Sequence, residues 1–329
     1  WKQYSGVWTM QSQMQAVSAG TWTGFPYLWG WGRNDYGQLG LSNVTYYSSP
    51  KQIGALTNWS SIACGIYHIV SIKTDGTLWS WGYNNNGQLG QGNVTNYSSP
   101  KQVGALTNWL SVSCGYYHTV SIKTDGSLWS WGRNSYGQLG QGNITNYSSP
   151  KQVGALTTWS SVACGYYHTV SIKTDGTLWS WGRNSQGQLG LGNTTNYSSP
   201  KQVGALTNWL SVSCGSYHTV SIKTNGTLWS WGYNNNGQLG LGNITYYSSP
   251  KQVGALTNWS SVSCGYNFTV AIKTDGTLWS WGQSTYGQLG LGNTTSYSSP
   301  KQVGILTNWS SVSCGYYHTV SIKTDGTLW

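Results

Sequence analysis

The hydrophobic and polar positions of this chain follow one pattern that recurs every fifty residues. Short apolar stretches alternate with glycine-rich polar turns, and the turn sequence GQLG returns at 37–40, 87–90, 137–140, 187–190, 237–240 and 287–290. A fixed period of this length is typical of repeat architectures, in which each unit is one supersecondary element that packs against its neighbours. The sequence therefore predicts six repeats of one structural unit.

Each repeat is predicted to form four short antiparallel strands. In one repeat the first strand covers 109–114, the second 118–123 and the third 128–132, and a fourth, outer strand covers 151–153. An Asp-Gly pair lies between the second and third strands, and this pair between two apolar runs is a strong hairpin signal. Four strands per unit, no helix and a period near fifty indicate a propeller blade rather than a β-solenoid, whose repeats are usually much shorter.

The predicted strands make five complete blades and two partial ones. Residues 28–53 supply strands three and four of one blade, and residues 309–329 supply strands one and two and the start of strand three. Pairing of these N- and C-terminal strands would close a ring of six blades and remove its free sheet edges. A seventh blade, completed by the N-terminal arm or by residues outside this sequence, is the alternative. We therefore expect an all-β propeller of six or seven blades.

Residues 1–27 stand outside the repeat, so we divide the chain into an N-terminal arm at 1–27 and a propeller at 28–329. The spacing of the methionines in the arm is that of one face of a short helix. The arm either packs on the propeller or anchors it in a larger assembly. The candidate anchor residues are Trp8, Met10, Met14 and Trp22.

Composition fits this architecture and argues against a nucleic-acid partner. The 329 residues include 45 glycines, 22 tryptophans and 24 tyrosines, which suit strands and tight turns. The net charge is +10 because the chain has only six acidic residues, whereas lysines recur evenly in the repeats. A nucleic-acid-binding protein would concentrate its cations on one face. No apolar run approaches the roughly 20 residues that a membrane span needs.

Residue types that often bind metals recur here at scaffold positions. The repeats place Cys and His at the spacing of Cys114 and His118. A zinc site needs about four ligands that converge on one point. One Cys-His pair per blade would instead spread these side chains around a ring. One repeat has Asn267-Phe268 in place of the Tyr-His pair and is otherwise unchanged. We therefore interpret the histidines as structural and the cysteines as small buried residues with free thiols, and we predict no metal site.

Catalytic constellations are not found in the sequence either. Five of the six aspartates occupy equivalent turns, where Asn225 takes the remaining position, and Asp35 is a single carboxylate without a partner carboxylate. No Ser-His-Asp arrangement and no phosphate-binding Gly-x-x-x-x-Gly-Lys loop occurs. We therefore predict a protein that is not an enzyme and has no cofactor.

The repeat resembles the RCC1 (regulator of chromosome condensation) family. Its Cys-Gly-x-x-His-Thr core, with Ile69 and Phe268 as departures in two copies, its Gly-x-Leu-Trp-x-Trp-Gly strand and its Gly-Gln-Leu-Gly turn recur in this order through residues 28–329. The resemblance implies a propeller, usually of seven blades. It also implies that some relatives catalyse guanine-nucleotide exchange on a small GTPase and that some bind chromatin. Exchange in the family depends on irregular loops with acidic residues, whereas these blades are near-identical and carry almost no acids.

The repeats differ from one another mainly in the loop between strands three and four. This loop begins with residues 33–36 in the first repeat, and a second variable stretch lies at 43–46 and its equivalents. Arg, Tyr and Asn on a rigid frame are typical of recognition surfaces; drift in exposed loops is the alternative. The candidate binding residues are Arg33, Asp35, Tyr36, Tyr83, Arg133, Tyr136, Arg183, Tyr233 and Tyr286.

These observations predict a non-enzymatic structural or binding propeller whose loop face recognises a protein or a glycan. The segment 4–26 is similar to segments that precede repeat domains in tail or other virion proteins of environmental bacteriophages. This similarity implies a virion component, with the arm binding other proteins of the particle, and a virion or extracellular location. The alternatives are an exchange factor or chromatin-type, nucleic-acid-binding protein of the RCC1-like kind, and a lectin.

Overall fold

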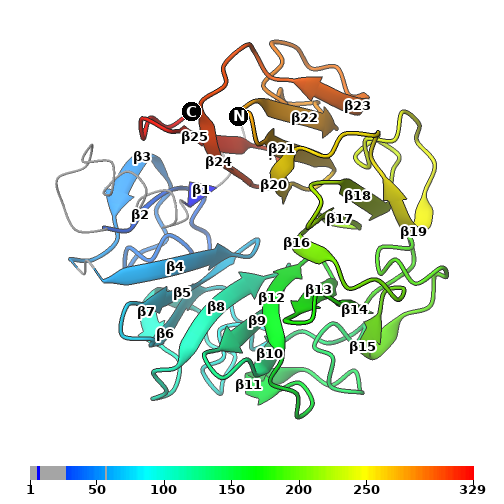
Figure 1. The fold of residues 1–329 in the computed structure, drawn as a ribbon. Helices are drawn as coiled ribbons and strands as arrows, with labels where there is room; N and C mark the ends of the chain where they lie inside the picture. Colours follow the sequence, from blue (N-terminus) through cyan, green and yellow to red (C-terminus); the bar gives the residue numbers. More distant parts are fainter. Residues whose placement is uncertain (1–5, 8–26, 56–57) are drawn as a thin grey trace.

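A computed structural model describes residues 6–7, 27–55 and 58–329, and these residues form strands and turns with no helix. They make seven separate sheets, which are arranged in a ring around a central channel (Figure 1). Five of the sheets have four strands each and are complete blades. The prediction of an all-β propeller with four-stranded blades is confirmed.

The complete blades repeat one order of strands, from the channel outward. The strand next to the channel comes first in the chain and the outermost strand comes last (Figure 1). The five blades are β4 (Trp59–Cys64), β5 (His68–Lys73), β6 (Leu78–Gly82) and β7 (Tyr97–Gln102); β8 (Trp109–Cys114), β9 (His118–Lys123), β10 (Leu128–Gly132) and β11 (Tyr147–Gln152); β12 (Trp159–Cys164), β13 (His168–Lys173), β14 (Leu178–Gly182) and β15 (Tyr197–Gln202); β16 (Trp209–Cys214), β17 (His218–Lys223), β18 (Leu228–Gly232) and β19 (Tyr247–Gln252); and β20 (Trp259–Cys264), β21 (Phe268–Lys273), β22 (Leu278–Gly282) and β23 (Tyr297–Gln302).

The two remaining sheets come from the ends of the chain. One contains β1 (Gly6–Val7), β2 (Trp29–Gly32) and β3 (Tyr47–Gln52), and the other contains β24 (Trp309–Cys314) and β25 (Thr319–Lys323). Of the two alternatives, pairing of the N- and C-terminal strands into a ring of six is not formed among the described residues, which make seven sheets; residues 6–7 of the N-terminal arm add β1 to the first of these. The reason is that both edges have other partners: β1 pairs with β2, and Trp329 exchanges two backbone hydrogen bonds of 2.8 Å with Ser321 on β25.

The Asp-Gly hairpin predicted from the sequence forms in every repeat. Gly126 has a φ of +77°, and a Cβ there would lie 2.2 Å from the carbonyl oxygen of Thr157, so only glycine fits this turn. The Asp125 carboxylate accepts hydrogen bonds from the backbone N–H and the hydroxyl of Ser127 at 2.9 and 2.6 Å. In the repeat with Asn225, the amide oxygen accepts the equivalent bonds from Thr227 at 3.2 and 2.7 Å. The interpretation of these aspartates as turn residues is confirmed.

The hydrophobic core lies between blades rather than within one blade. One cluster combines Val70, Ile72 and Leu78 of one blade with Trp109 and Trp131 of the next. The two tryptophan rings meet edge to face, with centroids 5.9 Å apart, and each ring of this size can bury roughly 150–250 Å². Equivalent clusters lie at five other interfaces between consecutive sheets, from the sheet of β1–β3 to that of β24–β25, and hold these sheets to one another by apolar contact.

Buried polar side chains also join neighbouring blades. The imidazole of His118 donates from Nε2 to the hydroxyl of Thr169 at 3.1 Å, and that hydroxyl donates to the carbonyl of Gln138 at 2.8 Å. Burial lowers the pKa of His118 to about 3, so the ring is neutral at physiological pH. The histidines therefore have the structural role predicted for them.

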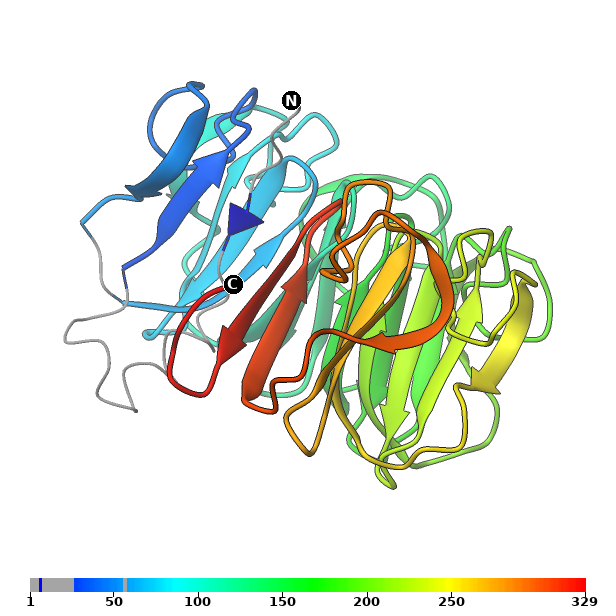
Figure 2. The same cartoon turned by 90° about the horizontal axis from the view of Figure 1, so that it is seen from above.

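The strand directions place two sets of loops at opposite ends of each blade. Residues 65–67 and 83–96 connect strands at one end, and the Asp-Gly turn at 74–76 lies at the other end, because the strands are antiparallel (Figure 2). We call the end formed by 65–67, 83–86 and their equivalents the mouth face. The end formed by 74–76, by the connections at 103–108 and by their equivalents is the rear face.

Candidate functional site

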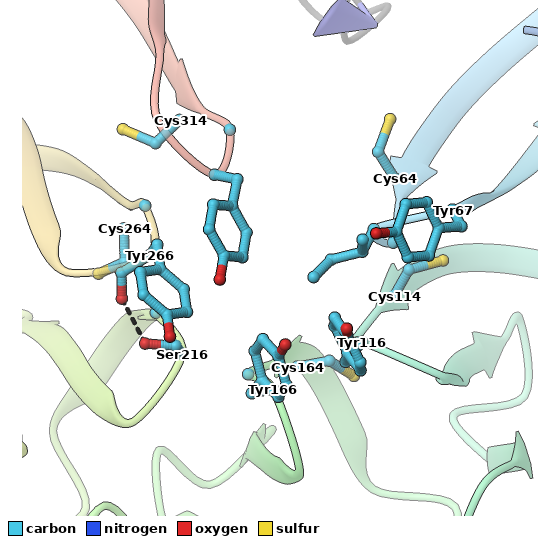
Figure 3. A pocket seen from close by; sticks show the side chains of 18 of the residues that line it. Cys64, Tyr67, Cys114, Tyr116, Cys164, Tyr166, Ser216, Cys264, Tyr266 and Cys314 are labelled. Atoms are coloured by element: carbon cyan, nitrogen blue, oxygen red, sulfur yellow. Dashed lines mark hydrogen bonds between the residues drawn. The ribbon is translucent and has the colours of Figure 1, made fainter. Parts of the chain in front are cut away.

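The channel opens at the mouth face in a cavity of about 400 Å³. Six repeats contribute the end of their first strand and the following Cys-Gly segment to its wall (Figure 3). A cavity of this size is within the range of small-ligand sites. The mouth is therefore the concave feature around which a candidate site can be built.

The six cysteines face this channel, which corrects part of the prediction made for them. They have free thiols, as expected, but only Cys264 is buried, and Cys64 is exposed. The thiol of Cys164 donates to the carbonyl of Ser113 in the preceding blade at 3.6 Å. Cys164 and Cys314 are half-buried against the clusters between blades, and this loss of water contact, like the full burial of Cys264, raises the pKa of these thiols to about 12. The channel wall therefore presents neutral thiols, which are poor nucleophiles and poor metal ligands.

Tyrosines that follow the cysteines form the rim of the cavity. Tyr116 stacks on Tyr166 with ring centroids 3.8 Å apart, and Tyr266 stacks on Tyr316 at 4.1 Å. Ser216 interrupts the series, and its hydroxyl donates to the carbonyl of Tyr266 (Figure 3). Sequence reasoning missed these rings because tyrosine stands at this position in four of the six repeats and was counted with the frame. The available signal was the change to Ile66 and Ser216 beside an otherwise unchanging strand.

The predicted loop arginines lie against a second set of tyrosines, one residue further along. The guanidinium of Arg33 is 5.2 Å from the ring centroid of Tyr67, and that of Arg133 is 5.3 Å from the centroid of Tyr167. Arg183 is 5.9 Å from the same Tyr167 ring. Stacking of this kind fixes the position of a guanidinium while its charge stays on the surface.

The predicted loop tyrosines join the same rings. Tyr36 lies 5.2 Å from Tyr67 and Tyr136 lies 5.2 Å from Tyr167, measured between centroids. The remaining contacts are Tyr83 with Tyr117 at 5.5 Å, Tyr233 with Tyr217 at 6.3 Å, and Tyr286 with Tyr317 at 5.0 Å. All of the predicted loop residues, including Asp35, whose carboxylate pairs with Arg33, thus lie on the mouth face.

The second variable stretch does not take part in these ring contacts, with one exception. Val44, Ile144 and Ile244 are exposed there as single side chains of different blades. Tyr246 is the exception, since its ring lies 4.9 Å from that of Tyr233. Of the two variable stretches, the one at 33–36 and its equivalents builds the mouth face.

Charges are distributed unequally between the two faces. All three arginines of the chain, Arg33, Arg133 and Arg183, lie on the mouth face. Of the six aspartates only Asp35 lies there, because the other five form turns on the rear face. Burial raises the pKa of Tyr167 and Tyr217, so their hydroxyls stay protonated. The mouth face is therefore cationic and aromatic, with neutral hydroxyl donors.

Metal binding and membrane insertion find no support in the part of the chain that the structure describes. Within residues 6–7, 27–55 and 58–329, no three His, Cys or Asp side chains group closely enough to hold a metal ion. The same residues contain no helix that could cross a membrane. The proposed anchor residues Trp8, Met10, Met14 and Trp22 lie outside the described residues.

Comparison with known proteins identifies the repeat. The sequence profile of the RCC1-like domain matches residues 10–258, and profiles of the RCC1 repeat match 259–288 and 275–322. A comparison with curated proteins finds no match.

Solved structures share the fold at low sequence identity. Human WBSCR16 superimposes with a TM-score of 0.80 at 23% identity, over 89% of this chain and 80% of the other. Yeast RCC1 (Prp20) in complex with Kap60 gives a TM-score of 0.83 at 20% identity, over 95% of this chain and 80% of the other. Prp20p of Saccharomyces cerevisiae, in a study of its binding to Gsp1p and histones, gives 0.79 at 23% identity, over 90% and 77%. At these identities the likeness concerns the fold.

Proposed function

Because this chain belongs to the RCC1-like domain family, we propose that it is a non-enzymatic propeller that binds another macromolecule through its mouth face. The observation that carries this proposal is the convergence of the variable loop residues on the channel mouth. Side chains that differ between repeats are spread over loops fifty residues apart, yet they contact one another or the second set of tyrosines, Tyr67, Tyr117, Tyr167 and Tyr217. Arg and Tyr that are half-buried on a rigid frame, as here, are residue types enriched at binding hot spots.

The contacts between these side chains form one continuous series across five sheets. From the first sheet, Tyr36 contacts Tyr67, Tyr67 contacts Tyr83, and Tyr83 contacts Tyr117. The series continues through Arg133, Tyr167, Arg183, Tyr217, Tyr233 and Tyr246. We call this series the aromatic arc. Its length favours an extended or broad ligand over a compact one.

The family context favours a protein partner. The yeast relative binds Kap60, and its binding to Gsp1p and histones has been examined, which makes a protein partner reasonable for this chain. Nucleotide exchange is less well supported. Asp35 is the one carboxylate on the described mouth face, and it is paired with Arg33, whereas exchange in the family uses acidic loops. The tyrosine-lined cavity keeps a lectin as the second candidate.

We also propose that residues 1–27 attach the propeller to a larger particle, such as a phage tail or virion, where it would act outside the cell. The motivation is the resemblance of segment 4–26 to virion proteins; in addition, residues 6–7 add a strand to the first sheet, which ties the arm to the propeller. Removal of residues 1–27 should abolish co-assembly with particle proteins while the blades stay folded. Unchanged assembly would refute the anchor role.

The binding proposal is tested by screening a random-peptide display library and a glycan array with matched variants. Tyr136→Ala/Tyr233→Ala removes one ring of the aromatic arc, Tyr233, and the ring of Tyr136, which lies 5.2 Å from Tyr167 of the arc. Leu156→Ala/Leu206→Ala removes two exposed side chains, 51% and 48% exposed, from the rear face. Ligands selected by the wild type should be lost on the first variant and retained on the second. Equal binding by both variants, or loss only on the rear variant, would refute the mouth face as the binding surface.

A further inference from the structure

We propose that the mouth face binds an acidic polysaccharide, a chain whose repeating sugar carries a carboxylate, with Arg133 and Arg183 as the residues that hold the carboxylates. This inference rests on the proposed binding function and specifies its ligand. It starts from a difference among the three arginines. Arg33 pairs with Asp35, whereas neither Arg133 nor Arg183 has a carboxylate partner among the described residues.

The two unpaired arginines are held in place by their own loops. The Nε of Arg133 donates to the hydroxyl of Ser135 at 3.1 Å, and the Nε of Arg183 donates to that of Ser185 at 3.0 Å. Both guanidinium groups lie over the ring of Tyr167, at 5.3 and 5.9 Å. A guanidinium fixed in this way loses little conformational entropy when it binds a carboxylate. Two such groups in consecutive repeats form a ready-made site for two acidic groups.

The tyrosines on either side suit sugar rings. The aromatic arc extends from the arginines toward Tyr117 and Tyr83 in one direction and toward Tyr217 and Tyr233 in the other. Tyrosine offers an apolar ring surface and a hydroxyl that forms hydrogen bonds, which matches the mixed apolar and hydroxyl character of a pyranose. Exposed polar side chains lie along the same loops, at Asn85, Ser135, Ser185 and Asn235.

The repetition of the site favours a repeating ligand. Arg133 and Arg183 occupy the same position of two repeats, and tyrosine takes that position at Tyr83 and Tyr233 on either side. A polysaccharide presents the same chemical group at regular intervals, so successive blades can bind successive units. Binding at several weak subsites then adds up to useful affinity. An irregular protein epitope would gain nothing from this periodicity.

Nucleic acid fits the charge of this face less well. Two unpaired cations neutralise only about two phosphates, whereas proteins that bind nucleic acid make several phosphate contacts. The lysines do not add positive charge to the mouth face. Lys173 and its equivalents lie over tryptophans near the rear face, with Nζ of Lys173 3.7 Å from the ring centroid of Trp179. Lys201 and its equivalents lie on the outer strands. A polysaccharide with two carboxylates matches this face in both respects, because the carboxylates pair with the two arginines and the sugar rings pack on the tyrosines.

The test measures binding of fluorescent decamers to the full chain by anisotropy. The acidic probes are oligogalacturonate and oligosialate, and the control is oligogalacturonate with its carboxylates methyl-esterified. Arg133→Gln/Arg183→Gln should weaken binding of at least one acidic probe roughly 10- to 100-fold, as expected for two charge-assisted contacts. Lys201→Gln/Lys251→Gln removes the same charge from exposed outer-strand lysines that also lie over tyrosines, and it should change affinity less than about twofold. Thermal unfolding verifies that each variant is folded.

Three outcomes would overturn the proposal. Equal affinity for the esterified probe would show that carboxylates are not recognised. Tighter binding of a glutamate decamer or of dT10 would assign the face to acidic protein segments or to single-stranded nucleic acid. No binding of either acidic probe would exclude this ligand class. In each case the peptide and glycan screen with the Tyr136→Ala/Tyr233→Ala variant still decides separately whether the mouth face binds a partner.

Discussion

The buried hydroxyl of Thr169 connects two blades, and removing it gives a sharp test of how the ring is held together. It accepts a hydrogen bond from His118 Nε2 at 3.1 Å and donates one to the carbonyl of Gln138 at 2.8 Å. Thr169→Val keeps the shape of the side chain and removes both bonds. The Gln138 carbonyl keeps its other donor, the indole of Trp181 at 2.9 Å. The His118 imidazole keeps none, because its Nδ1 already has no partner.

The expected cost follows from that difference. A buried donor left without a partner costs about 1–3 kcal/mol, and the lost bond to Gln138 adds less because one donor remains. We expect Thr169→Val to lower the free energy of unfolding by about 2 kcal/mol. The chain supplies the matched second change, since Phe268 stands at the histidine position of another blade and is fully buried. His118→Phe removes the orphaned donor, so the double variant should be less destabilised than the sum of the single ones.

The assay is guanidinium unfolding followed by tryptophan fluorescence, applied as a double-mutant cycle. The coupling energy between positions 118 and 169 should be about 1 kcal/mol or more. A cost of Thr169→Val below about 0.5 kcal/mol, or additive effects of the two changes, would refute the inter-blade hydrogen bond as a stabilising contact. Repeat proteins can unfold in stages. The unfolding energies are therefore compared only if fluorescence recorded at two or more wavelengths shows the same single transition.

Three further predictions concern the same frame. First, acid should unfold the protein, because burial lowers the pKa of four histidines, His68, His118, His168 and His218, to about 3. As the pH falls from about 6.5 to 3, the unfolded chain binds protons that the folded chain excludes, so each histidine lowers the free energy of unfolding by about 1.4 kcal/mol per pH unit. The unfolding free energy of His118→Phe should therefore depend less on pH. Second, Asp175→Asn should leave the unfolding midpoint unchanged and Asp175→Ala should lower it, because Asn225 already makes the turn bonds elsewhere; an equal effect of both would contradict the turn role. Third, Gly137→Ala should lower the unfolding midpoint more than Gly287→Ala. Both glycines have positive φ, but a Cβ at Gly137 would lie 2.4 Å from the Cα of Ser198, whereas a Cβ at Gly287 would meet open space. Equal unfolding midpoints of the two variants would rule out this contact.

The blade could be predicted from the sequence because its signals are local. Asp125-Gly126 marks a hairpin, and the apolar alternation of 118–123 marks the strand before it. These features depend on neighbours in the chain. The number of sheets depended instead on whether the two end sheets pair with each other. Trp329 pairs with Ser321 across the local Asp325-Gly326 turn, but the pairing of β1 with β2 joins segments that are separate in the chain, and no local pattern indicated it.

The candidate site was predicted only in part, for a related reason. Variation between repeats identified Arg133 and Tyr136, since exposed positions change while the frame is kept. The position of the rim tyrosines Tyr116 and Tyr166 is tyrosine in four of the six repeats, so comparison of repeats left it with the scaffold. Their stacking across blades depends on the curvature of the ring. The channel location of the cysteines likewise follows from the closure of the sheets around an axis.

The central claim is that recognition takes place at the mouth face. Hydrogen exchange of the full chain, with and without the tightest ligand from the peptide and glycan screens, tests it most directly. The account predicts slower exchange in segments 115–117, 133–136, 165–167 and 183–186, and unchanged exchange in the rear turns at 124–126 and 174–176. Protection confined to the rear turns, or to the outer strands, would contradict it.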